Sequence, residues 1–334
     1  MSKSIGGPKT AGSVQHEPIN IGTEATPPFV VPPEPAALFQ RRAKRLETLA
    51  AASELKSYLN FAASVCALQH DIANSAPAVA ALSEAHLAQS KAGTMPPLAG
   101  RDLLADPAFK ATLTALTAAI AAPLQNWPAE ARAAALNVAS LDDDALRNAI
   151  EAALFQDIEP GTVAEHVLLS AALQVHMARL AATLDNTQLV PVADGVCPAC
   201  GSAPVASAVV GWPSAQNTRF CTCSMCATQW NVVRVKCVTC GSTGGIGYYA
   251  IEGQPDTLKA ETCTNCKSYV KIVYQVNDAA LDPLADDTAT LALDMKLAQE
   301  GWTRRAVNLF LAGSAGTAAP VANPDSAAPA QDGV

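Results

Sequence analysis

The sequence predicts an α+β protein in which an N-terminal all-α domain is followed by two tandem four-cysteine modules and a C-terminal helix. Three observations support this class. The first 190 residues are rich in alanine and carry leucines at helical spacing. Nine of the ten cysteines fall within residues 197–266, and eight of these form four Cys-x-x-Cys pairs. Short runs of β-branched residues alternate with these pairs, and a helical pattern returns near residue 284.

The composition divides the 334 residues into six expected segments. Both ends are rich in Pro, Gly, Ala and Thr without apolar periodicity, which is typical of disordered tails. The expected segments are a disordered tail at 1–28, an α-helical domain at 29–188, a first four-cysteine module at 189–236, a second module at 237–280, a C-terminal helix with its extension at 281–312, and a disordered tail at 313–334.

The helical domain is expected to hold six helices. The first helix is expected to begin near Pro35, the second to run from about Ser53 to Ile72, and the third from Asp106 to Pro123. The other three are expected at about 129–139, 142–155 and 163–184. Asp106 followed by proline predicts a capped helix start. Thr162 and Glu165 have the spacing of a capping box. The last of these helices is the most apolar, but Gln174, His176 and Arg179 interrupt it, so it is expected in the core and not in a membrane.

The cysteine block is one unit repeated. Adding 40 to the positions of the first two pairs gives the positions of the other two, and Gly201 and Gly241 obey the same offset. The pairs are Cys197/Cys200, Cys223/Cys226, Cys237/Cys240 and Cys263/Cys266. Equal spacing favours one ion on the first two pairs and a second ion on the last two, although a crossed arrangement is open. Strands are expected at Val205–Trp212, Thr228–Lys236, Ile246–Ile251 and Ser268–Val276.

Cys-x-x-Cys pairs at this spacing predict two closed metal sites of the rubredoxin or zinc-ribbon type. A Cys-x-x-Cys turn aims two thiolates at one ion, and four sulfurs suit iron and zinc equally well. Disulfides are disfavoured, since the sequence begins Met-Ser-Lys-Ser-Ile without an apolar signal segment and a cytoplasmic location is expected. A closed four-thiolate site leaves no open coordination position, so hydrolytic catalysis at the metal is not expected. The chain is expected not to be an enzyme, with a redox step at bound iron left open. Cys221 and Cys66 are expected to be strand and core residues and not ligands.

The charge balance disfavours nucleic acid as a partner. The formal net charge is −8, and residues 194–276 carry six basic against four acidic side chains before any metal-bound thiolate is counted. Thiolate sites carry further negative charge, which makes the block a poor reader of phosphate backbones.

Several motifs resemble the FdhE-type formate dehydrogenase accessory proteins. They are Cys197-Pro-Ala-Cys200-Gly201, Trp230 leading through Val232-Val233-Arg234-Val235-Lys236 to Cys237, Tyr269-Val270-Lys271-Ile272-Val273-Tyr274-Gln275, Leu38-Phe39 through Arg41-Arg42-Ala43 to Arg45-Leu46, and Ala285-Asp286-Asp287 through Leu293-Asp294 to Glu300-Gly301-Trp302. The resemblance covers about 29–310. It departs at Leu309, where the family often has proline, at the extra Cys221 and in the alanine-rich middle.

The resemblance implies a cytoplasmic assembly factor. Such a protein binds the catalytic subunit of a respiratory formate dehydrogenase and is needed for its maturation before export. The eight paired cysteines would hold two rubredoxin-like iron ions, with zinc as the other candidate. Two other classes stay open: a rubredoxin-like redox carrier and a zinc-ribbon nucleic-acid-binding protein. The sequence also leaves open whether the chain forms a homodimer.

Overall fold

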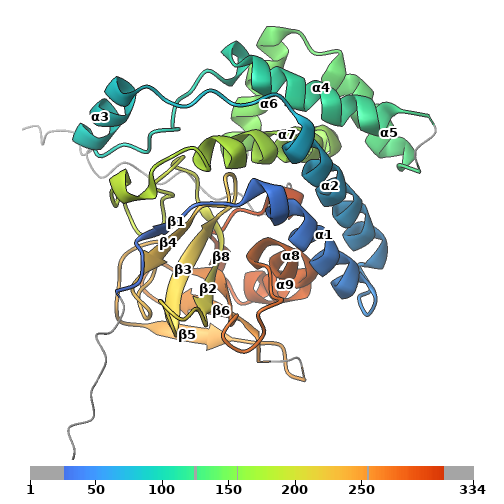
Figure 1. Cartoon of the computed structure of the whole chain (residues 1–334). Helices are drawn as coiled ribbons and strands as arrows, with labels where there is room; N and C mark the ends of the chain where they lie inside the picture. Colours follow the sequence, from blue (N-terminus) through green and yellow to red (C-terminus); the bar gives the residue numbers. More distant parts are fainter. Residues whose placement is uncertain (1–25, 124–125, 156, 254–255, 312–334) are drawn as a thin grey trace, which may run out of the picture.

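The computed structural model describes residues 26–123, 126–155, 157–253 and 256–311. The expected tails lie outside these ranges, apart from residues 26–28. Figure 1 shows a layer of helices on one side of a sheet, with the last helices against the sheet at its lower right. Among the described residues no helix is long and apolar enough to cross a membrane.

Seven helices of the described chain precede the main strands. They are α1 Pro35–Ala50, α2 Lys56–Ser75, α3 Glu84–Ala92, α4 Pro107–Ala121, α5 Ala129–Ala139, α6 Asp143–Phe155 and α7 Val163–Ala181. Helix α7 is the centre of this layer: it packs against α2, α4, α5 and α6, and nearly all of its residues are buried. Six of the seven helices match the expected ones to within a few residues at each end.

The helix starts show which local signals the fold uses. Asp106 caps α4 as expected, since its carboxylate accepts a 2.9 Å hydrogen bond from the N–H of Ala108. The expected capping box at α7 is wrong: the hydroxyl of Thr162 donates to the carbonyl of Glu159 instead, and Glu165 accepts from Asn137. Helix α3 was not expected, although Ser83 caps it.

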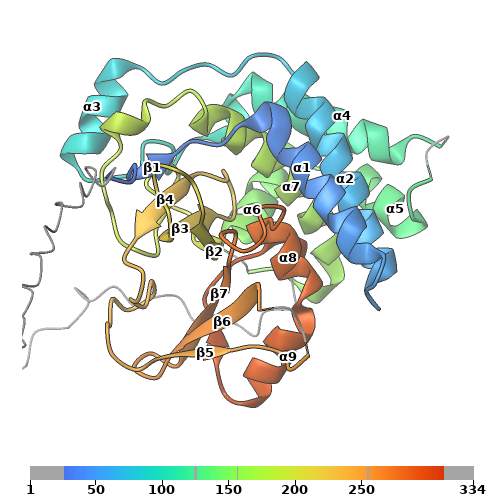
Figure 2. The same cartoon turned by 60° about the horizontal axis from the view of Figure 1, so that its bottom comes forward.

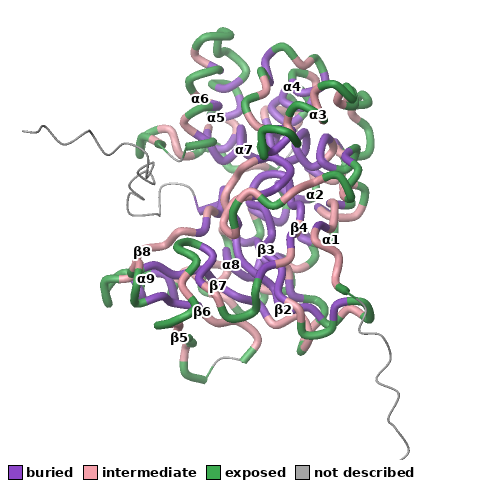
Figure 3. The backbone as a smooth tube through the Cα atoms, turned by 90° about the vertical axis from the view of Figure 1, so that its left-hand side faces the viewer, coloured by how far each residue is buried: buried purple, intermediate pink, exposed green. Residues whose placement is uncertain are grey.

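The two cysteine modules share a single eight-stranded sheet. Its strands are β1 Val30–Val31, β2 Pro204–Val210, β3 Thr218–Cys223, β4 Gln229–Val232, β5 Ile246–Tyr249, β6 Leu258–Cys263, β7 Ser268–Val273 and β8 Thr303–Arg304. The order is β1-β4-β3-β2-β7-β6-β5, with β8 on β7. Each module is antiparallel, and the parallel pairing of β2 with β7, at Ser207 opposite Ile272, joins them. The joined strands β2 and β7 are buried throughout, whereas β5 forms an exposed edge (Figure 3).

Strands β3 and β6 were not expected from the sequence. They lie at positions 218–223 and 258–263, so the offset of 40 holds for the strands as well as for the cysteines. The expected strand at Thr228–Lys236 is shorter, because β4 ends at Val232.

The expected C-terminal helix is two helices, α8 Pro283–Ala289 and α9 Leu291–Gln299, with a break at Thr290. Helix α8 lies beside α1 in both views (Figures 1 and 2). Arg45 of α1 forms a bidentate ion pair with Asp286 of α8, with a shortest N–O distance of 2.6 Å. Buried Lys271 of β7 donates to Asp294 of α9 at 2.6 Å, so one ion pair joins α1 to α8 and another joins α9 to the sheet.

Candidate metal centres

The first and third Cys-x-x-Cys turns have the same backbone geometry. The N–H of Cys197 donates to the carbonyl of Ser202 at 3.0 Å, and the N–H of Gly201 donates to the carbonyl of Cys197 at 2.9 Å. The third turn repeats both bonds, from Cys237 to Ser242 at 2.8 Å and from Gly241 to Cys237 at 2.9 Å. Gly201 and Gly241 have φ values of 84° and 74°, the left-handed region that glycine enters without steric cost.

The second and fourth turns adopt the same left-handed conformation without glycine. Ala227 follows Cys226 with φ of 58°, and Lys267 follows Cys266 with φ of 54°. A side chain with a Cβ in this region costs free energy. All four turns therefore have a residue with positive φ after their second cysteine. In the two turns without glycine, this conformation costs conformational free energy that the other interactions of the folded module offset.

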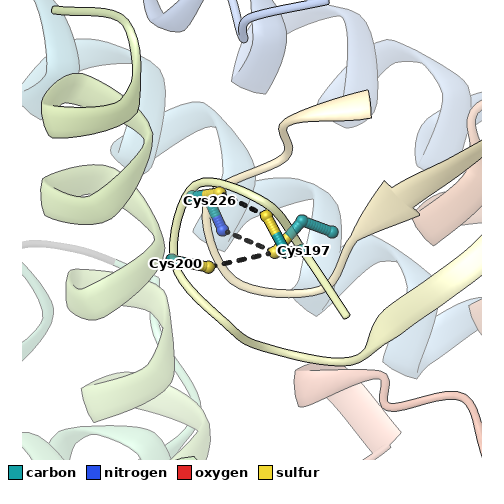
Figure 4. Close-up of side chains that lie close together, drawn as sticks. Cys197, Cys200 and Cys226 are labelled. Atoms are coloured by element: carbon teal, nitrogen blue, oxygen red, sulfur yellow. Dashed lines mark hydrogen bonds between the residues drawn. The ribbon is translucent and has the colours of Figure 1, made fainter. Parts of the chain in front are cut away.

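The structure brings the eight cysteines together in the two sets that equal spacing predicts. The first cysteine group is Cys197, Cys200, Cys223 and Cys226, and the second cysteine group is Cys237, Cys240, Cys263 and Cys266. Within each group all Sγ atoms lie within 4.8 Å of one another. In Figure 4 the side chains of Cys197 and Cys200, from the first turn, lie close to that of Cys226, from the second turn. The crossed arrangement is not seen.

The sulfur spacing fits a metal ion and not a disulfide. The Sγ–Sγ distances are 3.6 Å for Cys197–Cys226 and 3.4 Å for Cys200–Cys223, and the corresponding distances in the second group are both 3.7 Å. A tetrahedron with metal–sulfur bonds of about 2.3 Å has edges of about 3.8 Å. A disulfide would need about 2.05 Å. Each group could therefore hold one ion at its centre.

Polar groups surround the sulfurs. The backbone N–H groups of Met225 and Cys226 each donate to Sγ of Cys223 at 3.4 Å. A serine or threonine lies two residues after the second cysteine of every turn, and in three turns its hydroxyl lies within hydrogen-bonding distance of that cysteine's sulfur. The distances are 3.4 Å for Ser202 from Cys200, 3.1 Å for Thr228 from Cys226 and 2.9 Å for Ser268 from Cys266. Backbone N–H donors stabilise thiolates at a metal site, and the hydroxyls of Ser202 and Thr228, which accept from the thiols here, could donate to the deprotonated sulfurs.

The two groups differ in their exposure to solvent. All four cysteines of the first group are buried. In the second group Cys237 and Cys263 are buried, Cys266 is half-buried and Cys240 is exposed. Both groups are built from the same repeated unit, so the unit itself does not explain the difference in exposure. The difference comes from what packs against each group.

The helical layer covers the first cysteine group. The side-chain amide of Gln174 in α7 donates a 2.8 Å hydrogen bond to the carbonyl of Ser224, inside the second turn. Gln69 of α2 donates in turn to the amide oxygen of Gln174 at 3.1 Å. The N–H of Leu98 donates to the carbonyl of Ala199 in the first turn at 2.9 Å. Gln174, expected only to interrupt an apolar helix, therefore holds the site against the core.

The chain is similar to known proteins over most of its described residues. Three family models match, described as "FdhE, N-terminal" at residues 27–194, "FdhE, central domain" at 196–234 and "FdhE, C-terminal domain" at 235–311. The chain belongs to the FdhE family. A Rhizobium meliloti protein named as an FdhE homolog is 40% identical over 302 residues, which is 90% of this chain and 98% of that protein. Escherichia coli FdhE is 34% identical over 277 residues, which is 82% of this chain and 88% of that protein.

A solved structure supports the fold of this FdhE-family chain. The crystal structure of the FdhE protein from Pseudomonas aeruginosa is similar with a TM-score of 0.76 at 37% sequence identity. The match covers 86% of this chain and all of that one. The α+β class and the FdhE resemblance are thus confirmed.

In each cysteine group of this FdhE-family chain some thiols keep their protons when no ion is bound, whereas hydrogen bonds lower the pKa of Cys200 well below its ordinary value and, against the effect of burial, that of Cys240 to about 7. Burial raises the pKa of Cys197 and of Cys223 well above the ordinary value of a thiol. In the second group burial raises the pKa of Cys237 to about 12. Four neighbouring thiols cannot all ionise out of water, and a cation at the centre offsets that cost. The donor set therefore suits a metal ion.

The two remaining cysteines belong to neither group. Cys221 is buried in β3 and Cys66 is buried in α2, and burial raises the pKa of each thiol to about 12. Adding 40 to Cys221 gives Glu261, whose carboxylate lies 2.9 Å from the guanidinium of buried Arg219. This ion pair joins β3 to β6 across the modules. The repeat offset is a signal that could have drawn attention to position 261.

Proposed function

We propose that the protein is an accessory factor that binds the catalytic subunit of a respiratory formate dehydrogenase in the cytoplasm. In this proposal the subunit needs the factor to mature to activity before export. The observation that carries the proposal is family membership over residues 27–311, in all three regions of the FdhE models. The proposal assigns no catalytic residue to the chain.

The proposal makes the eight paired cysteines the ligands of two metal ions. Sulfur spacing near that of a tetrahedron and the donors around the sulfurs support this assignment. Iron is favoured by the family resemblance, and zinc fits the same four thiolates. The domain boundaries expected from the sequence belong to the same proposal, with one ion in each module.

The ions would act by ordering the client-binding surface. Each module is a short antiparallel ribbon, which buries too few apolar side chains to be stable alone. An ion in each module adds folding free energy, on the order of 10 kcal/mol for a structural site. The joined sheet and the helices against it would then present one continuous surface to the client.

Binding to a purified catalytic subunit tests the proposal. The variant Cys237→Ala/Cys240→Ala should lose one of two ions and bind the subunit at least about tenfold more weakly, because the second module loses its order. Cys66→Ala, which removes a buried cysteine that belongs to neither group, should keep both ions and full binding. A double variant with full binding and full metal content would contradict the proposal.

Deletion of the gene in a formate-oxidising host tests the maturation step. We expect the catalytic subunit to be made without becoming active, and activity to return with the wild-type gene. Normal formate dehydrogenase activity in the deletion strain would contradict the assignment.

The exposure of Cys240 favours one other candidate, a redox carrier. Electron transfer needs an ion near the surface, and only the second group has an exposed ligand among the described cysteines. Iron-loaded protein should then undergo reversible one-electron reduction in the second module, and loss of that signal in Cys237→Ala/Cys240→Ala would locate it there.

A further inference from the structure

The two cysteine groups have the same ligands but different surroundings. The first group lies within the main hydrophobic core, where Ala199, Met225 and Trp230 are also buried. The second group is at the rim of the sheet region, and Cys240 reaches solvent there. Asn265, an exposed side chain, is its nearest side-chain donor, at 3.8 Å.

A cleft opens beside Cys240, between the two modules. Its volume is about 450 Å³, and it is lined by residues that include Phe29, Asp194, Trp230, Asn231, Lys236 and Cys240. A cleft of this size admits a small aromatic chelator or a side chain of another protein. None of the residues that line this cleft is a ligand of the first group.

An ion pair connects the two sides of this cleft. Nζ of Lys236, the residue before Cys237, lies 2.6 Å from Oδ2 of Asp194 in the segment before Cys197. Both side chains are about one-third exposed. The indole N–H of buried Trp230 fixes the Asp194 backbone by donating to its carbonyl at 2.8 Å. The ion pair therefore restrains the third turn, which carries Cys237 and Cys240, against the buried first module.

We propose that the ion of the second cysteine group exchanges with solution through this cleft, with Cys240 as the first ligand to leave, while the first group keeps its ion until the chain unfolds. In the exchange the bond from the ion to Sγ of Cys240 breaks. A donor atom of the incoming ligand takes that position, and the released thiolate takes a proton from water. The inference rests on the ligand assignment made under the proposed function.

The difference follows from access. A closed four-thiolate site leaves no open coordination position, so an incoming donor must reach the ion itself. At the second group the donor approaches past Cys240. At the first group it would have to displace the turns that Gln174 and Leu98 hold against the core, which requires opening of the domain.

Zinc release from the full chain tests the inference. Protein loaded with zinc is mixed with excess 4-(2-pyridylazo)resorcinol, and the absorbance of the zinc complex is followed. We expect two zinc ions per chain, one released at least about tenfold faster than the other, which leaves only on denaturation. Cys237→Ser/Cys240→Ser should remove the fast ion and keep the slow one.

The Lys236–Asp194 pair supplies a milder variant that keeps all ligands. Lys236→Gln should speed the fast phase several-fold and leave the slow phase unchanged. Lys259→Gln is the matched control, because it breaks an ion pair with Asp256 in the same module away from the cleft. Equal effects of the two variants on the fast phase would overturn the role of the ion pair.

Two zinc ions that leave at one rate would overturn the inference and leave the ligand assignment intact. Fewer than two bound ions would overturn the ligand assignment itself. Alkylation gives an independent readout on wild-type protein: iodoacetamide should modify Cys240 of the zinc-loaded chain before any cysteine of the first group. Equal modification of Cys200 would contradict the inference.

Discussion

The side-chain amide of Gln174 donates to the backbone carbonyl of Ser224 across fifty residues of sequence, and so ties helix α7 to the first cysteine group. Both partners are buried. The same glutamine accepts from Gln69, so one chain of hydrogen bonds joins α2, α7 and the second turn. The helical layer therefore forms one side of the first cysteine group.

Gln174→Ala tests this connection. The variant leaves the carbonyl of Ser224 and the amide of Gln69 without this partner inside the core, which should lower the free energy of unfolding by about 1–3 kcal/mol. Gln89→Ala, on the exposed face of α3, should change it by less than about 0.5 kcal/mol. Urea denaturation measures both, and equal effects would show that the hydrogen bond contributes nothing.

Gly195→Ala tests the close approach of the two modules. A Cβ at Gly195 would lie 2.6 Å from the carbonyl oxygen of Val238, which sits between Cys237 and Cys240. Because both atoms belong to fixed backbone, we expect a loss of about 1–3 kcal/mol in the free energy of unfolding. Gly244→Ala, where a Cβ has open space, is the control. A variant as stable as the control would mean that the modules can separate without cost.

Ala227→Gly should stabilise the protein. Ala227 has a positive φ, where its Cβ costs about 1–2 kcal/mol, and glycine gives back about 0.5–1 kcal/mol through the greater entropy of the unfolded chain. The expected gain is a few tenths to about 1 kcal/mol in thermal or urea unfolding. Ala199→Gly, in a turn position without a positive φ, should be destabilising by about 1 kcal/mol. Loss of stability in both variants would contradict the cost assigned to Ala227.

The buried imidazole of His176 predicts a dependence of stability on pH. Burial lowers the pKa of His176 to about 4, although Asp106, whose carboxylate lies 3.4 Å from Nε2, opposes the shift. The His176 imidazole is protonated near pH 6.5 in the unfolded chain but only near pH 4 in the folded chain. The free energy of unfolding should therefore be unaffected above about pH 6.5 and fall by up to about 3 kcal/mol toward pH 4.

His176→Gln isolates this contribution. The difference in stability between wild type and variant should shift against the wild type as the pH falls from 6.5 to 4. His70→Gln, at a partly exposed position on α2, should keep the pH dependence that His176 produces in the wild type. A difference between wild type and His176→Gln that is constant across this range would show that the imidazole titrates alike in both states.

The features that sequence alone predicted are those written in local patterns. The start of α4 follows from Asp106 and the proline after it, and the grouping of the cysteines follows from the offset of 40. Strands β3 and β6 were not predicted because polar residues such as Arg219, Lys259 and Glu261 occupy them. Arg219 and Glu261 are buried there because each neutralises the other across the modules, and that partnership is visible only in three dimensions.

The unequal exposure of the two cysteine groups had no local signal either. Both groups follow one repeated sequence pattern, so the pattern predicts the same exposure for both. Only the packing of α7 and of residues 96–99 against the first group separates them. The break at Thr290 also depends on a contact between residues that are distant in sequence. Buried Lys271 donates to the Thr290 carbonyl and hydroxyl, at 3.1 and 2.9 Å, and so fixes the chain at the junction of α8 and α9.

Crystallographic data collected at the absorption edge of the bound metal test the central claim most directly. The account predicts two anomalous peaks per chain, each about 2.3 Å from four sulfurs. One peak should lie among Cys197, Cys200, Cys223 and Cys226, and the other among Cys237, Cys240, Cys263 and Cys266. A ligand set drawn from both modules, or sulfurs bonded at about 2.05 Å as disulfides, would contradict it.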